Sequence, residues 1–233
     1  RPTTANRYGQ ITFRAAKLAE AALEAGGGPV DAVVASVIDS LNRRYSIMQT
    51  VGDLLAELIP QDGRILTQCF GETIVGMMLR EARERGKRLR LFCPETRPYF
   101  QGARLTATVC SEMGFDTTVI TDNMPAWVME REGIDVFTCA ADAICLDGHV
   151  ANKVGTFQIA IVANRFGVPV YITGAPDKGH KTRSDIRVEM RDGKFTLQAM
   201  GVRTAAAGVK GYYPAFDITP PELITGIVTD IGI

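Results

Sequence analysis

The segment from Cys139 to Phe157 reads Cys-Ala-Ala-Asp-Ala-Ile-Cys-Leu-Asp-Gly-His-Val-Ala-Asn-Lys-Val-Gly-Thr-Phe. The apolar run that ends at Ala140 is typical of a buried strand, and Asp142 follows it closely. Asn152 and Lys153 stand where we expect the next helix to begin. Ligands of open parallel α/β sheets bind outside the carboxyl ends of the strands, and the first amides of a helix attract anions. The segment therefore predicts a site for a small phosphorylated molecule at the edge of a parallel sheet.

Short apolar segments alternate with helical segments through most of the chain after residue 61. This alternation predicts repeated βαβ units and a doubly wound, mostly parallel sheet of the α/β class. The expected strands are Arg64–Gln68, Leu89–Cys93, Thr117–Thr121, Val136–Ala140 and Val168–Thr173. The expected helices between them are Gly71–Glu84, Gly102–Met113, Pro125–Arg131 and Lys153–Phe166.

The first quarter of the chain is predicted to be helical. Apolar residues recur at helical spacing from Ala5 to Ala25, and Pro29 opens a second helix that reaches about Leu41. A third helical piece covers about residues 48–58. We therefore expect a helical N-terminal region at residues 1–60 and an α/β domain at residues 61–233. Because the chain begins with Arg1 and not with methionine, we expect the N-terminal region to be truncated at its start.

The C-terminal part follows a less regular pattern. The segment from Asp177 to Gly201 is polar, and a hairpin is predicted around Asp192-Gly193. The last residues, from Ile224 to Ile233, form a largely apolar run. This run predicts a late strand or a subunit contact.

Composition argues against several classes of partner. Hydrophobic residues make up 46% of the chain and charged residues 22%, as in an ordinary packed protein. Lys plus Arg and Asp plus Glu both number 26, so no overall basic field favours nucleic acid. We see no signal peptide and no apolar run of membrane-spanning length, which favours a cytoplasmic protein without a membrane partner. The five cysteines lack zinc-type spacing, so we expect reduced thiols and no metal site.

Candidate site residues follow the predicted strands. Cys69 lies between a strand end and a helix start, where the helix dipole would lower a thiol's pKa, although its position alone slightly favours a buried core cysteine. Asp142 has apolar neighbours that would raise a carboxyl pKa and suit a general acid, but it could also cap a turn. Gln101 begins a helix, so its amide could reach a substrate hydroxyl. The residues alone indicate an α/β enzyme without a nucleotide-binding glycine motif, with these three side chains and Asn152-Lys153 at its site.

Several blocks of sequence, in order along the chain, resemble the methylthioribose-1-phosphate isomerase family. The superfamily also contains ribose-1,5-bisphosphate isomerase and the regulatory subunits of the translation-initiation guanine-nucleotide exchange factor. The blocks are Glu95–Ala107, Ile120–Met124, Ala141–Ile144, Asp147–Thr156, Gly201–Thr204, Gly208–Tyr212 and Pro214–Thr225.

The resemblance implies a helical N-terminal region, a Rossmann-like C-terminal domain and a homodimer. It also implies isomerisation of an aldose 1-phosphate to the ketose 1-phosphate, without a metal or an organic cofactor. Carried over by motif, the catalytic residues are Cys69 and Asp142. The substrate-binding residues are Arg1, Gln101, Asn152 and Lys153.

The chain also departs from that family. The Arg-Gly-Ala motif that the family carries upstream of Arg1 is absent, and Thr67–Glu72 and His149 differ from the usual residues. These departures open the pocket near the far end of the sugar to groups other than methylthio. From the resemblance, the first substrate that we expect is 5-methylthioribose 1-phosphate, a methionine-salvage intermediate. The alternatives are 5-deoxyribose 1-phosphate, ribose 1,5-bisphosphate, or a non-catalytic regulatory subunit.

Overall fold

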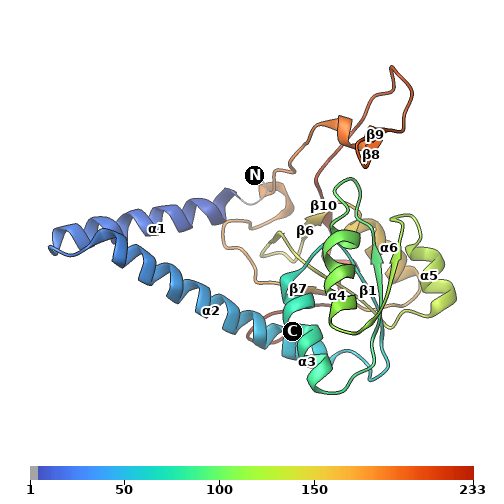
Figure 1. Ribbon diagram of the computed structural model, residues 1–233, viewed down its shortest axis with the longest axis horizontal. Coiled ribbons are helices and arrows are strands. Elements are labelled where there is room, and N and C mark those ends of the chain that lie inside the picture. Colours follow the sequence, from blue (N-terminus) through green and yellow to red (C-terminus); the bar gives the residue numbers. More distant parts are fainter. Residues whose placement is uncertain (1–4) are drawn as a thin grey trace.

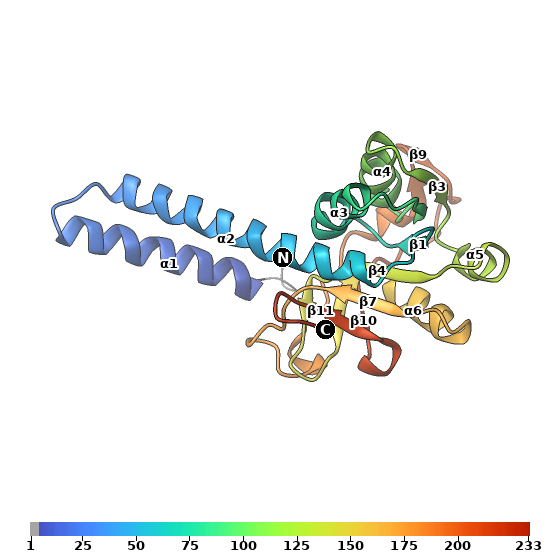
Figure 2. The same ribbon diagram turned by 90° about the horizontal axis from the view of Figure 1, so that it is seen from below.

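Two long helices form an antiparallel hairpin that projects from an α/β body (Figures 1 and 2). The computed structural model describes residues 5–233. Helix α1 spans Ala5–Glu24 and helix α2 spans Pro29–Glu57. The prediction of a break between residues 41 and 48 was wrong, because α2 is continuous there. That part of α2 lacks apolar periodicity, but it contains no Gly or Pro and lies exposed, where a helix needs no buried stripe.

The last turns of α2 belong to the core of the α/β body. Val51, Leu55 and Ala56 are buried against one face of the main sheet, together with the helices that follow β1 and β2. Gly52 allows the close contact, since a Cβ atom there would lie 2.5 Å from the Cβ atom of Met77. The end of α2 therefore shares a core with the sheet, and the division at residue 60 stays a prediction.

The main sheet has six parallel strands in the order β11-β7-β4-β1-β2-β3, which confirms the predicted α/β class. The end of α2, α3 and α4 cover one face, and α5 and α6 cover the other (Figure 2). The strands are β1 (Arg64–Thr67), β2 (Arg90–Pro94), β3 (Asp116–Ile120), β4 (Val136–Ala140), β7 (Val170–Thr173) and β11 (Gly226–Val228). The helices are α3 (Leu79–Glu84), α4 (Thr108–Glu112), α5 (Pro125–Glu132) and α6 (Thr156–Arg165), with π-helical segments η2 (Thr73–Met78) before α3 and η3 (Gly102–Ala107) before α4.

A second, antiparallel sheet adjoins the carboxyl edge of the first and corrects one prediction. It consists of β5 (Ala143–Ile144), β6 (Val150–Lys153) and β10 (Phe216–Thr219). Asn152 and Lys153 therefore lie in a strand, and the helix begins only at Thr156. The partner strand β10 comes from far along the chain, so local sequence could not reveal the pairing.

The C-terminal part was predicted partly wrongly. The hairpin is formed by β8 (Gln198–Ala199) and β9 (Val202–Arg203), whereas the residues after Asp192 form a 3-10 helix, η5 (Gly193–Leu197). The Asp192 carboxylate accepts a hydrogen bond from the Lys194 amide at 2.9 Å, which favours the helical turn. The late strand is confirmed as β11, at the edge of the main sheet. Two further 3-10 helices are η4 (Arg183–Asp185) and η6 (Pro221–Leu223). None of the helices in residues 5–233 is long and apolar enough to span a membrane.

Gly52→Ala tests the contact between α2 and the π-helical segment. We expect a loss of about 1–3 kcal/mol in the free energy of unfolding, because the new methyl group overlaps Met77. Gly76→Ala is the matched control, since a Cβ atom there meets nothing within 4 Å. Denaturant unfolding of both variants measures the difference, and equal stability would contradict the tight packing.

Candidate functional site

Cys69 follows β1 at the carboxyl edge of the sheet, in a strained backbone conformation. Its φ angle is 60°, a left-handed value that is uncommon outside glycine. The Cys69 amide donates to the Thr96 hydroxyl at 3.2 Å, and the Thr106 hydroxyl donates to the Cys69 carbonyl oxygen. These contacts from the next βα loop and its helix hold the cysteine in place.

Lys153 is the buried cation of the site. Its side chain lies on β6 and the residue is only 4% exposed, with Nζ 5.0 Å from the centre of the Phe216 ring. Burial lowers the pKa of Lys153, and the nearby Cys69 and Asp142 partly offset that shift. The ammonium, the thiol and the carboxylate therefore lie within range of one another's charges. The structure thus brings together three of the residues that the sequence predicted.

The thiol of Cys69 does not have the lowered pKa that its position before a helix predicted. Burial raises its pKa, and the charges of Asp142 and Asp122 add to that effect. The Lys153 ammonium and the Phe70 amide act in the opposite direction without reversing it. Desolvation outweighs both, so the resting thiol is protonated at neutral pH.

Asp142 lies in the turn between β4 and β5. Its amide donates to the Ala151 carbonyl oxygen at 3.0 Å, which fixes the residue against β6. The side chain is half-buried and interacts electrostatically with Cys69 and Lys153. A carboxyl group in this position can exchange a proton with a ligand bound beside the thiol.

Gln101 stands at the start of η3, on a loop that the structure holds rigidly. Thr96 and Arg97 donate their amides to the carboxylate of Asp122 at 2.8 and 2.7 Å. The side-chain oxygen of Gln101 is buried and has no hydrogen-bond partner among the described residues. A buried acceptor without a partner suits a ligand hydroxyl.

Asn152 does not share the environment of Lys153. Successive side chains of a strand point to opposite faces, and the Asn152 amide donates to the Thr156 hydroxyl at 3.1 Å. Burial raises the pKa of the Cys139 thiol, and the Asn152 amide partly offsets that rise. The structure therefore places Asn152 against α6 and β4. Arg1, the remaining predicted site residue, lies outside the described residues.

The N-terminus of α6 is already occupied by a carboxylate, so it is not the open anion site that the sequence suggested. Asp217 on β10 accepts the Gly155 amide at 2.6 Å and the Phe157 amide at 3.2 Å. Burial raises the pKa of Asp217 to about 6, against the effect of these amides. Sequence reasoning missed this residue, because its position depends on the pairing of β10 with β6.

Arg191 is a second cation that the sequence did not indicate. Its Nε donates to Glu189 at 2.8 Å, and its guanidinium lies 5.5 Å from the ring centre of Tyr99 and 5.9 Å from that of Tyr213. The Arg191 charge also contributes to the lowered pKa of Lys153, after the larger effect of burial. The sequence carries no signal for Arg191, because it lies in a polar segment without helical or strand periodicity.

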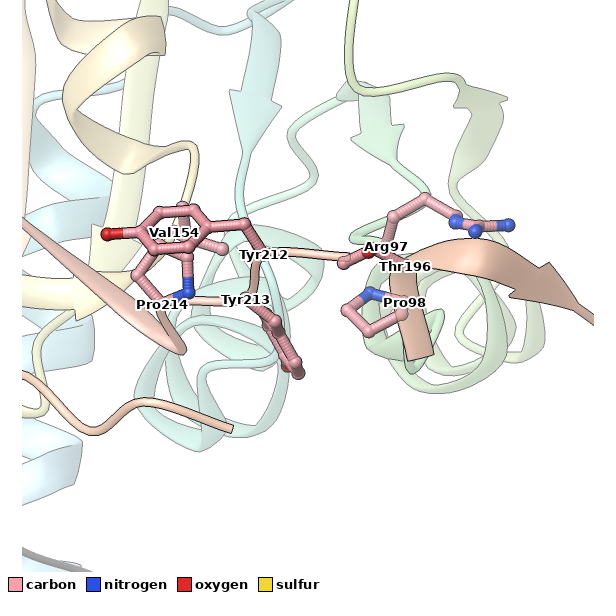
Figure 3. A pocket seen from close by; sticks show the side chains of 7 residues that line it. All are labelled: Arg97, Pro98, Val154, Thr196, Tyr212, Tyr213 and Pro214. Atoms are coloured by element: carbon pink, nitrogen blue, oxygen red, sulfur yellow. The ribbon is translucent and has the colours of Figure 1, made fainter. Parts of the chain in front are cut away.

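A cavity of about 270 Å³ lies beside Arg97 and Tyr213, and the side chains of Cys69, Gln101, Asp142 and Lys153 are not among those that line it (Figure 3). Val154, directly after Lys153, forms part of its wall, and its carbonyl oxygen accepts a hydrogen bond from Gln68 at 3.1 Å. A second cavity of the same size lies on the other side of Pro98. Within the part of the chain that the structure describes, no three His, Cys, Asp or Glu side chains are grouped so that they could hold a metal ion. The cavity walls are lined by Arg97, Pro98, Val154, Thr196, Tyr212, Tyr213 and Pro214.

The fold and these groups define a doubly wound α/β protein with a thiol, a carboxylate and a buried ammonium at the carboxyl edge of its sheet. The chain belongs to the Initiation factor 2 subunit family, whose model matches residues 14–233. It is 39% identical over 198 residues to the methylthioribose-1-phosphate isomerase of Fervidobacterium nodosum, covering 80% of this chain and 56% of the relative.

Two other similarities broaden the comparison. The 5-deoxyribose 1-phosphate isomerase of Clostridium botulinum (strain Langeland) is 41% identical over 199 residues, covering 80% of this chain and 56% of that protein. The crystal structure of the delta subunit of translation initiation factor eIF-2B from A. fulgidus aligns with a TM-score of 0.82 at 30% identity, covering 93% of this chain and 67% of that one. The chain thus spans little more than half the length of these two curated relatives.

Lys153→Met tests the electrostatic contact between the lysine and the thiol. Removing the ammonium destabilises the thiolate, so we expect the already raised pKa of Cys69 to rise further. The pH dependence of Cys69 alkylation by iodoacetamide, followed by peptide mass spectrometry, measures the shift. Lys194→Met is the control, because Lys194 is largely exposed and pairs only with Asp192 among the ion pairs of the described residues. A Cys69 alkylation profile unchanged in Lys153→Met would contradict the arrangement.

Proposed function

We propose that this chain forms the catalytic part of an isomerase that converts an aldose 1-phosphate to the ketose 1-phosphate. The first substrate is 5-methylthioribose 1-phosphate and the product 5-methylthioribulose 1-phosphate, in methionine salvage. The observation that supports this function best is the grouping of Cys69, Asp142 and Lys153 at the carboxyl edge of the sheet. The names of two similar proteins, both isomerases of sugar 1-phosphates, agree with it.

The three groups suit the chemical steps of such a reaction. A sugar phosphorylated on its anomeric oxygen opens its ring only with acid assistance, and Asp142 supplies that proton to the ring oxygen. Lys153 holds the phosphate as a charged donor. Gln101, with its unpartnered side-chain oxygen, accepts a hydrogen bond from a sugar hydroxyl. Arg1 completes the proposed substrate-binding set, and Asn152 supports it from the opposite face of β6 through its hydrogen bond to Thr156.

The raised pKa of Cys69 favours one of the two routes for hydrogen transfer. A protonated thiol is poorly suited to remove the C2 proton, so we place the transfer as a hydride shift from C2 to C1 after ring opening. Asp142, which gave its proton to the ring oxygen, then takes up the proton released from the C2 hydroxyl. A ketone remains at C2. Cys69 packs beside the reacting carbons and excludes water from them.

Turnover in deuterium oxide distinguishes the routes. A hydride shift leaves the product without carbon-bound deuterium at C1, which proton NMR of the ketose phosphate shows directly. Incorporation of one deuterium at C1 would instead assign the transfer to a base that exchanges with solvent, and would refute the protonated-thiol route.

Cys69→Ser and Asp142→Asn test the proposed function in the full-length protein. We expect Asp142→Asn to lower kcat about 100-fold or more, the usual scale for removing a group that moves protons. We expect Cys69→Ser to lower kcat as well, because a hydroxyl group would hold water beside the reacting carbons, while both variants retain sugar-phosphate binding. Phosphorus NMR follows ketose formation from 5-methylthioribose 1-phosphate, 5-deoxyribose 1-phosphate and ribose 1,5-bisphosphate. Cys145→Ser and the exposed Asp192→Asn serve as controls. Full activity in either site variant would refute the assignment.

A regulatory role is the second candidate function, because the similar delta subunit is a translation initiation factor. Such a protein would bind a partner and convert none of the three sugars. We further propose that the protein is a cytoplasmic homodimer that binds neither nucleic acid nor membranes. Size-exclusion chromatography with light scattering measures the oligomeric state.

A further inference from the structure

Tyr213 carries a buried hydroxyl group whose proton has no acceptor in the described part of the chain. The residue is 2% exposed, and the Arg191 guanidinium that faces the phenol oxygen can only donate a hydrogen bond. Buried hydroxyl groups without partners are rare in folded proteins because they lose their hydration without compensation. A ligand atom that completes this hydrogen bond would account for the group.

The position of the Tyr213 ring is fixed by its surroundings. The Arg191 amide donates to the Tyr213 carbonyl oxygen at 2.9 Å, and Met190 forms a β-bridge with Pro214. The ring packs edge-on against Tyr99 at 6.0 Å and under the Arg191 guanidinium at 5.9 Å. The hydroxyl is therefore held in one direction before any ligand arrives, which reduces the entropy lost on binding.

Tyr213 also belongs to the region of the proposed reaction. The Arg191 guanidinium lies 5.9 Å from the centre of the Tyr213 ring and 5.8 Å from that of the Phe216 ring, and the Lys153 ammonium lies 5.0 Å from the same Phe216 ring. Burial raises the pKa of the phenol, Arg191 opposes that shift, and a charge on Cys69 raises the pKa further. The phenol is thus a neutral donor within range of the thiol. Figure 3 shows that the neighbouring Tyr212 ring points in a different direction.

We propose that Tyr213 is a substrate-binding residue whose hydroxyl donates a hydrogen bond to an oxygen of the sugar phosphate held between Cys69, Asp142 and Lys153. This inference rests on the proposed function, to which it adds a specificity-determining contact. Because the contact is polar, it favours sugar phosphates that present an oxygen to Tyr213 over analogues that lack one.

Tyr213→Phe removes only the hydroxyl and tests the inference in the full-length protein. We expect kcat/KM of the variant to be about ten- to hundredfold lower than that of the wild type, measured with the sugar phosphate that the wild type converts. This is the effect of losing a hydrogen bond to a charged group. The loss falls mainly on KM, because the contact is made with the bound substrate. Tyr212→Phe is the matched control, since Tyr212 lines the same cavity but is 76% exposed.

Calorimetric titration with the same sugar phosphate separates this inference from the isomerase proposal. A wild type that binds the ligand without converting it, together with weaker binding by Tyr213→Phe, upholds the contact and refutes the isomerase. A wild type that neither binds nor converts the sugar phosphates refutes both. Unchanged KM and affinity in Tyr213→Phe, or a lower Tm with unchanged affinity, overturn the inference and leave the isomerase standing.

Discussion

The burial of the Lys153 ammonium is the constraint on which the rest of the site depends. An isolated ammonium in an apolar environment is strongly destabilising, so its surroundings must supply opposing charge. Asp142 does so from the carboxyl edge of the main sheet, and Glu189 does so from the C-terminal segment. Phe216 on β10 offers the face of its ring at 5.0 Å. Lys153 thus interacts with groups from both sheets and from the C-terminal segment that contains Glu189.

Strained backbone conformations concentrate at the carboxyl edge of the main sheet, where the candidate site lies. Cys69, Thr96 and Phe100 all have φ angles near 60°. Such conformations persist only where neighbouring contacts impose them, and they concentrate at functional sites. Here the Asp122 carboxylate holds the amides of Thr96 and Arg97, and the Thr96 hydroxyl accepts the Cys69 amide. The loops after β1, β2 and β3 therefore form one hydrogen-bonded unit.

Sequence patterns predicted the parts of the molecule that local rules govern. Apolar runs between helical segments located the strands of the main sheet, and the strand-end rule selected Cys69, Gln101 and Asp142. The patterns failed where distant segments pair. Lys153 was placed in a helix because β10 could not be foreseen, and Tyr213 and Arg191 depend on a β-bridge between residues 190 and 214. The sequence predicted a lowered pKa for Cys69, whereas its pKa is raised because burial outweighs the helix dipole.

The lowered pKa of Lys153 couples ligand charge to protonation. A phosphate bound beside the lysine adds the negative charge that burial makes most favourable there, and so raises the pKa again. In the proposed isomerase, the same phosphate would therefore stabilise the charged form of the lysine. The burial that lowers the pKa of the lysine is thus the feature that would make a bound phosphate most favourable, as the proposed function requires.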